Sequence, residues 1–295
     1  MALAPLFSSA CDLAHRMPPL VAEFLELETH LRRRFREESI TDLLVASLSC
    51  LPDKDLVVFF PKNETNTGED FDLILFDPIL RQAVQYRIQA KRLKPHPTNW
   101  LIGSYPELAH PHGTGKQSLS LVRSAAAEKR IRTIPLYAFY NPAGACDSSG
   151  GLLSGINLAD GRMIRGLVRA LIKAKPKRPP LKRLSTLQPL FFSLSAILCP
   201  PSGGLVNLSP AESLRSVTGA MAAATLRFID AFEGVARPLL ADARRHEKDW
   251  ERALGSFEEP PPMLRKAMEL RGRDPLERLS PARVPRPRVV LISSD

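Results

Sequence analysis

Residues 68–91 constrain the fold of this chain more than any other segment, because they have the pattern of two strands joined by a turn. Successive side chains of a strand point to opposite faces of the sheet. The first strand therefore turns Asp70 and Asp72 to one face, and the second turns Gln89 and Lys91 to one face. The pattern predicts an antiparallel hairpin that carries polar groups on a single face.

The turn between the two strands is indicated by Asp77 and the proline that follows it. Directly opposed residues of a hairpin point to the same face of the sheet. One register sets Asp72 opposite Gln89 and Asp70 opposite Lys91. A slip of two residues keeps these side chains on one face, whereas a slip of one residue sends Gln89 to the other face.

The predicted polar patch has the chemistry of a magnesium site. Carboxylate and amide oxygens are hard ligands for Mg²⁺, which usually keeps several waters and takes a phosphate oxygen from its substrate. A lysine beside the metal can hold the attacking water and offset negative charge on phosphorus, which favours hydrolysis of a phosphodiester. The alternative is the solvated outer face of a hairpin, because antiparallel sheets are commonly polar on one side.

The order of these residues resembles the PD-(D/E)xK nuclease superfamily, and more narrowly its Mrr-like branch, in which a glutamine replaces the usual acid before x-Lys. The matching stretch runs from Glu38 to Asn141 and includes GEDFD before one strand, IQAKR on the next and the later strand PLYAFYN. The resemblance implies an α/β fold with a restriction-endonuclease-like core, in which a central mixed sheet is flanked by helices. It implies these catalytic residues: Glu38, Asp70, Asp72, Gln89, Lys91 and Gln117.

The resemblance also implies a role for each group in the patch. Asp70, Asp72 and Gln89 are expected to bind Mg²⁺ or Mn²⁺. Lys91 is expected to position the attacking water and stabilise charge, and Glu38 is expected to assist from an early helix. Because the side chain of Gln89 supplies no negative charge, one bound metal ion is expected rather than two.

The charge and the cysteine content narrow the classes of function. A net charge of +10 and a pI near 9.7 favour a polyanionic partner such as nucleic acid. No segment approaches the roughly 20 apolar residues of a membrane span, and the first residues lack the pattern of a signal peptide. The four cysteines form no CxxC pair, so neither a zinc knuckle nor a disulfide scaffold is expected, and a reducing cytoplasm is the default.

Hydrophobic periodicity predicts the elements around the hairpin. A helix over residues 20–36 is expected to bury one apolar stripe, formed by Leu20, Phe24, Leu27, Leu31 and Phe35. The run LVVFF at 56–60 predicts a buried strand. A helix over 117–130 and a strand over 134–141 predict a βαβ crossover from the hairpin. At the start of that helix, Gln117 is either a supporting glutamine of the kind found in several nuclease branches or a plain polar residue of the first turn.

The chain is expected to divide into four parts. Residues 20–175 form the nuclease-like core, in which the Gly-, Ser- and Ala-rich residues 142–160 are expected to be a loop. Residues 176–188 form a basic, proline-rich linker. Residues 189–275 form a mainly helical C-terminal extension. Residues 276–295 form a flexible tail, although RVVLISS within it has the composition of an edge strand.

These features together favour a metal-dependent nuclease that hydrolyses the phosphodiester bonds of nucleic acid, DNA before RNA. A place in bacterial defence is implied by the family resemblance alone. Two alternatives stay open: a catalytically inactive nucleic-acid-binding module of the same fold, and an RNA-cleaving toxin or effector domain. The pattern is compatible with a homodimer and with partner proteins of a defence system. It predicts a cytoplasmic protein without a membrane partner.

Overall fold

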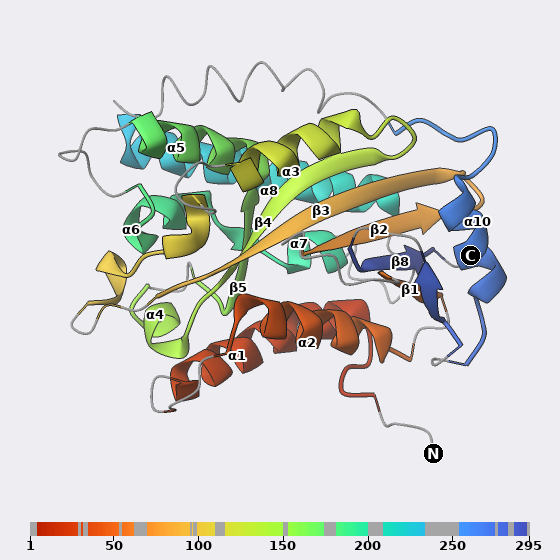
Figure 1. Cartoon of the computed structure of the whole chain (residues 1–295), viewed down its shortest axis with the longest axis horizontal. Helices are drawn as coiled ribbons and strands as arrows, with labels where there is room; N and C mark the ends of the chain where they lie inside the picture. Colours follow the sequence, from red (N-terminus) through yellow and green to blue (C-terminus); the bar gives the residue numbers. More distant parts are fainter. Residues whose placement is uncertain are drawn as a thin grey trace.

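The computed structural model of the chain is an α/β fold built on one eight-stranded mixed sheet (Figure 1). The structure describes residues 5–28, 31, 35–52, 55–61, 70–94, 96, 99–109, 116–149, 153–173, 181–199, 209–233, 254–274, 277–282 and 286–293.

The sheet has the strand order β6-β5-β4-β3-β2-β8-β1-β7. Its strands are β1 (Leu56–Pro61), β2 (Phe71–Asp77), β3 (Gln82–Arg92), β4 (Arg132–Tyr140), β5 (Ile156–Asp160), β6 (Phe192–Ser193), β7 (Leu279–Ala282) and β8 (Arg288–Ile292). The pairs β1/β7, β2/β8 and β3/β4 are parallel, and the other neighbours are antiparallel. The predicted hairpin is the pair β2/β3, and the predicted crossover runs from β3 to its parallel neighbour β4.

Helices cover both faces of the sheet. They are α1 (Ala10–Glu28), α2 (Glu37–Ser49), α3 (Lys116–Ala127), α4 (Ala143–Asp147), α5 (Gly161–Lys173), α6 (Leu184–Leu187), α7 (Ser195–Leu198), α8 (Pro210–Ala231) and α10 (Pro262–Leu270). Apolar residues of α1, α2, α7 and α8 form one core with the sheet, and those of α5 and α10 contribute to two cores on the other face. Figure 1 shows α1 and α2 on one side of the strands and α3 and α5 on the other.

Helix α1 buries a different stripe from the one predicted. The helix begins at Ala10 rather than near residue 20, so its inward face is set by the apolar residues of its first turns. The buried stripe includes Leu13, Met17, Val21 and Leu25. The predicted stripe is exposed at Leu20, Phe24, Leu27, Leu31 and Phe35, so that prediction is wrong.

The expected flexible tail is part of the sheet. Strand β8 lies between β2 and β1, and β7 lies beside β1, so residues 276–295 supply one inner strand and one edge strand. Strand β5 occupies the end of residues 142–160, which were expected to be a loop. Because β6, β7 and β8 lie outside residues 20–175, the sheet is not confined to the predicted core. The expected helical extension contains α8 and α10, while its residues 234–253 lie outside the described residues.

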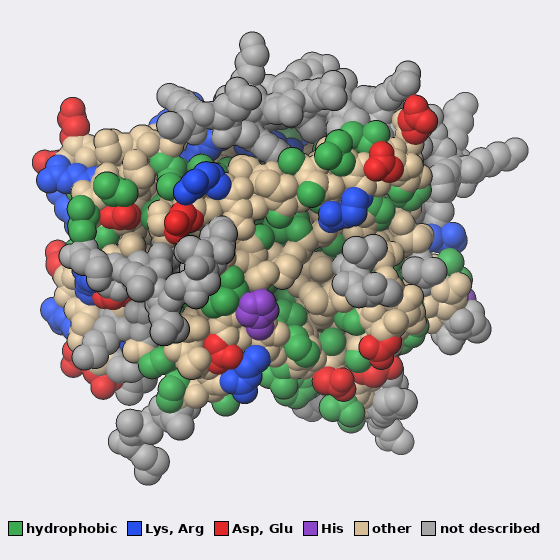
Figure 2. Space-filling model, turned by 180° about the vertical axis from the view of Figure 1, so that it is seen from behind, with side chains coloured by type: hydrophobic (Ala, Val, Ile, Leu, Met, Phe, Trp, Pro, Cys, Tyr) green, Lys and Arg blue, Asp and Glu red, His purple; other side chains and the backbone are tan. Residues whose placement is uncertain are grey.

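The surface mixes charges of both signs. On the face seen from behind, Lys and Arg side chains lie among Asp and Glu side chains and hydrophobic ones (Figure 2). The net charge of +10 is therefore not gathered into one patch on this face. Within the described part of the chain, no helix combines the length and the apolar character that crossing a membrane requires.

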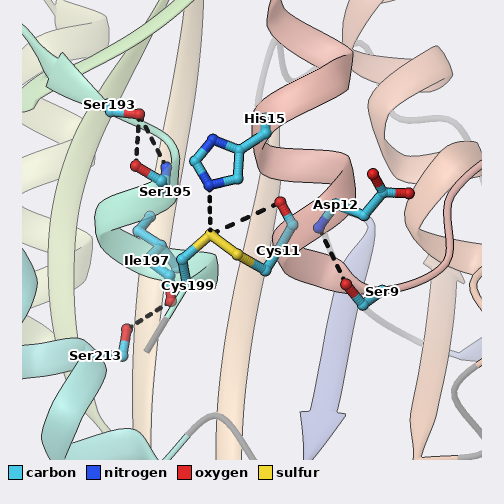
Figure 3. Close-up of a disulfide and its surroundings, with 9 residues drawn as sticks. All are labelled: Ser9, Cys11, Asp12, His15, Ser193, Ser195, Ile197, Cys199 and Ser213. Atoms are coloured by element: carbon cyan, nitrogen blue, oxygen red, sulfur yellow. Dashed lines mark hydrogen bonds between the residues drawn. A yellow bond between two sulfur atoms is a disulfide. The ribbon is translucent and has the colours of Figure 1, made fainter. Parts of the chain in front are cut away.

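A disulfide joins Cys11 of α1 to Cys199, the residue after α7 (Figure 3). The two residues are 188 positions apart in the sequence, whereas Cys50 and Cys146 are free thiols. No disulfide scaffold was expected, and this single long-range disulfide was not predicted. Spacing along the chain identifies local cysteine motifs, and it cannot identify a pair that only the tertiary fold brings together.

The position of β8 can be tested with a matched pair of leucines. Leu291 of β8 is buried at 4% exposure, whereas Leu80 in the β2–β3 turn is 54% exposed. Because Leu291→Ala removes buried apolar atoms and leaves a cavity, we expect it to lower the free energy of unfolding by roughly 2–5 kcal/mol. Leu80→Ala should change it by no more than about 0.5 kcal/mol. Chemical denaturation measures both, and equal effects would contradict the placement of β8.

Candidate active site

The predicted face of the hairpin is correct, and its register differs from the prediction by two residues. Asp72 pairs with Arg87 instead of Gln89. Continuing this register by two residues beyond Asp72 sets Asp70 opposite Gln89, which pairs on its other side with Tyr137 of β4. These side chains share the face of the sheet that α3, α5 and α10 cover, since the alternate residues of β2 and β3 pack into the opposite core.

Asp70 lies directly before β2 and contacts the next strand. The backbone N–H of Ala90 donates a hydrogen bond to Oδ2 of Asp70 over 2.6 Å. Burial raises the pKa of the Asp70 carboxyl to about 7, against the effect of the Lys91 ammonium, which favours the charged form. The carboxylates of Glu37 and Glu38 add to the increase in pKa. Asp70 is thus held at a position where a nearby cation would stabilise its ionised form.

Lys91 is buried, and its partner is Glu37 rather than the predicted Glu38. Nζ of Lys91 lies 3.1 Å from Oε1 of Glu37, and the lysine side chain is 1% exposed. Glu37 opens α2 one turn before the buried residues Ile40 and Thr41, which places it on the inward side of the helix. Glu38 is exposed. Burial raises the pKa of Glu37, and the charge of Lys91 opposes that change.

Gln89 lies between these charged groups on β3. The residue is 4% exposed, and its side-chain oxygen Oε1 has no hydrogen-bond partner among the described residues. A buried polar atom without a partner costs free energy and is uncommon in folded proteins. The amide oxygen of Gln89 and the carboxylate of Asp70 are the oxygen ligands that Mg²⁺ takes when water and substrate phosphates complete its shell. These two side chains therefore offer ligand atoms of the kind that one Mg²⁺ or Mn²⁺ ion takes.

Tyr137 is a member of this region that the sequence pattern did not single out. Burial raises the pKa of its hydroxyl above the ordinary range, and the negative charges of Asp70 and Glu37 add to the increase. The nearby side chain of Ser118 in α3 opposes this increase. Gln117 precedes Ser118 in the first turn of α3, so the structure brings the start of this helix close to the Gln89 row.

Asp72 belongs to a separate group of charges. Its side chain is fully buried, and its carboxylate lies 3.0 Å from Nε of Arg87, 3.4 Å from Nε of Arg288 and 3.8 Å from Nε of Arg286. Arg87 donates a second hydrogen bond, from Nη2 to Oδ2 over 3.3 Å. With both oxygens held by guanidinium groups, Asp72 is not placed as a metal ligand, so the predicted role of Asp72 is at odds with this geometry.

A groove opens on the same face, near the other end of β3. Its volume is about 1030 Å³, and its wall includes Ala83 and Thr133 of the sheet. The charged residues that line it are Lys129, Arg130, Arg132, Arg162, Arg265, Glu128, Glu258 and Glu259. Among the described residues of this wall, positive charges outnumber negative ones by five to three. Ala83 alternates in phase with Gln89 along β3, so the groove and the Asp70–Gln89 row share one face of the sheet.

The raised pKa of Asp70 predicts a pH-dependent stability. Between its ordinary value of 3.8 and about 7, the unfolded chain releases this proton while the folded chain keeps it. The contribution of Asp70 to stability is therefore present below pH 3.8 and is lost as the pH rises through 7. The asparagine side chain of Asp70→Asn does not titrate. The free energy of unfolding of Asp70→Asn, relative to that of the wild type, should therefore increase between pH 4 and pH 8.

Chemical denaturation in a chelating buffer across this pH range measures the difference in free energy of unfolding between Asp70→Asn and the wild type. Asp230→Asn makes the same replacement at an exposed position of α8 and serves as the control. A difference between Asp70→Asn and wild type that does not vary with pH would contradict the burial of the Asp70 carboxyl.

Comparison with known proteins gives a family but no activity. No curated protein and no solved structure matches the chain. The model of one family, described as a family of unknown function (DUF6615), matches residues 10–295. Since this match covers nearly the whole length, the chain belongs to the DUF6615 family of unknown function.

Proposed function

We propose that this protein is a metal-dependent nuclease that hydrolyses phosphodiester bonds of nucleic acid, DNA before RNA. The observation that carries the proposal is the buried Oε1 of Gln89, which has no hydrogen-bond partner among the described residues. Gln89 lies opposite Asp70 when the hairpin register is continued by two residues, and the buried Lys91 lies two residues further along β3. An oxygen without a partner beside a carboxylate of raised pKa is the environment that a divalent cation would satisfy.

The arrangement of elements around this site supports a restriction-endonuclease-like core. Helix α2, which carries Glu37, precedes the β2/β3 hairpin. Helix α3 connects β3 to its parallel neighbour β4. The order of helix, hairpin, helix and strand is the order in which the motif residues occur in the chain. In this proposal Glu37 takes the role that was expected of Glu38, because Glu37 contacts the lysine.

Each residue of the site would have a separate role in hydrolysis. Mg²⁺ bound by Asp70 and Gln89 would polarise a phosphate oxygen of the substrate. The ammonium of Lys91 has three donors, one of which is directed at Glu37. Its remaining donors can orient an attacking water and offset the charge that develops on the phosphate. Glu37 fixes the position of the lysine and can accept a proton from that water, since burial raises its pKa.

One further feature of the same face suits a polyanionic substrate. The groove near Ala83 carries an excess of positive charge. Side chains six residues apart on one strand are about 20 Å apart, so site and groove can contact one extended nucleic-acid segment. Binding through phosphates gives affinity without sequence preference.

One observation favours an inactive nucleic-acid-binding module as the second candidate. The Lys91–Glu37 ion pair is mostly buried, so the pair can serve the fold rather than hydrolysis. An RNA-cleaving toxin or effector domain and a role in bacterial defence remain proposals that follow from the resemblance. Metal dependence separates the nuclease from the binding module, and the preferred substrate separates DNA cleavage from RNA cleavage.

The decisive variant is Lys91→Met, which keeps most of the side-chain volume and removes the ammonium. Supercoiled plasmid, single-stranded DNA and RNA are incubated with the protein in Mg²⁺ or in chelator, and cleavage is followed on gels. We expect the wild type to cleave DNA only with the metal, and Lys91→Met to lose activity by about 10²-fold or more. Lys266→Met, at an exposed position of α10, should retain full activity.

The double variant Glu37→Gln, Lys91→Met separates folding from catalysis. Removing the lysine alone leaves a carboxylate without its partner, which destabilises the protein. The double variant removes both charges, so it should fold as the wild type does by circular dichroism and still be inactive. Metal-dependent cleavage by the folded double variant at the wild-type rate would overturn the role of this site.

A further inference from the structure

The disulfide region contains a third residue with metal-binding chemistry. Cys11 and His15 are four residues apart on α1, which places both on one side of the helix. Nε2 of His15 lies 3.5 Å from Sγ of Cys199, and Figure 3 shows the imidazole directed at the sulfur pair. The three ligand atoms lie within 4.8 Å of one another. Among the described residues, Cys11, His15 and Cys199 form a group whose ligand atoms lie close enough together to hold one metal ion.

The disulfide alone does not explain the position of His15. A disulfide needs two sulfurs and no imidazole, and His15 is exposed, so its orientation is not forced by packing into the core. Two thiolates and an imidazole nitrogen are the ligands that Zn²⁺ prefers. With Zn–S and Zn–N bonds of about 2.3 and 2.0 Å, sulfur and nitrogen ligands of a tetrahedral zinc ion lie about 3.5 Å apart. The separation of His15 and Cys199 meets this requirement.

We propose that the reduced form of this chain binds one Zn²⁺ ion through Cys11, His15 and Cys199, with water in the fourth position. A dithiol reduces the bond: it gives two electrons to the sulfur pair, becomes a disulfide itself, and leaves two protein thiols. Each thiol then loses its proton as its sulfur bonds to zinc. Oxidation by a low-molecular-weight disulfide reverses both steps, so that zinc is released and two reduced thiols form.

The site would tie the same two segments together in either state. Cys11 and His15 belong to α1, and Cys199 follows α7. In the oxidised form the sulfur–sulfur bond joins these segments, and in the reduced form the zinc ion joins them. The connection between α1 and α7 therefore does not depend on whether the surroundings are oxidising. Because His15 is exposed and the two cysteines are partly exposed, the ion can reach the site from solvent.

The test is zinc binding by the full-length chain before and after reduction. The protein is reduced with a dithiol, freed of reductant, exposed to one equivalent of Zn²⁺ and desalted, and bound zinc is measured by elemental analysis. Co²⁺ replaces Zn²⁺ in a parallel titration, because thiolate ligation gives it a charge-transfer band. We expect one ion per reduced chain at this site and none in the oxidised chain.

Variants identify the ligands. His15→Ala should keep the disulfide, as judged by thiol counts after oxidation, and lose at least about tenfold in metal affinity, since one of three ligands is gone. Cys199→Ser should lower the intensity of the cobalt–thiolate band, because one of the two thiolates is gone. Cys50→Ser, a free and exposed cysteine outside the group, is the matched control and should bind as the wild type does. Unchanged affinity in His15→Ala, or no metal in the reduced wild type, would overturn the proposal.

Discussion

The buried carboxylate of Asp72 holds the centre of this sheet together. Arg87 of β3 and Arg288 of β8 lie directly opposite it on the two neighbouring strands, and both contact it. A buried charge is costly unless it is paired, so each of these strands is held at the register that brings its arginine to Asp72. The same register sets Asp70 opposite Gln89. The candidate active site therefore depends on an ion group that takes no part in it.

Local sequence patterns were sufficient for the hairpin and its faces, and the turn accounts for the difference in register. Oδ1 of Asp77 accepts hydrogen bonds from the N–H groups of Ile79 and Leu80. Arg81 closes the turn with a positive φ of 51°. Because this tight turn pairs Asp77 with Gln82, the β3 partner of each β2 residue lies two positions earlier than predicted. Alternation has a period of two, so the faces were correct although the partners were not.

Contacts between distant parts of the chain could not be read from such patterns. Arg288 follows Asp72 by more than 200 residues, and Cys199 follows Cys11 by 188. Only the folded sheet and its helices bring these groups together. The sequence also could not decide between the adjacent acids Glu37 and Glu38. That choice depends on the orientation of α2, which is shown by the buried residues of the helix and is not implied by the resemblance.

In the proposed function, Asp70 and not Asp72 is the carboxylate that would bind the metal ion. Electron paramagnetic resonance of Mn²⁺ measures this directly, with the Cys11–Cys199 disulfide kept intact. We predict one Mn²⁺ bound per wild-type chain and displaced by Mg²⁺, loss of that binding in Asp70→Asn, and its retention in the folded fraction of Asp72→Asn. Retention of Mn²⁺ in Asp70→Asn together with its loss in folded Asp72→Asn, or no binding by the wild type, would contradict the role of Asp70 as the metal ligand.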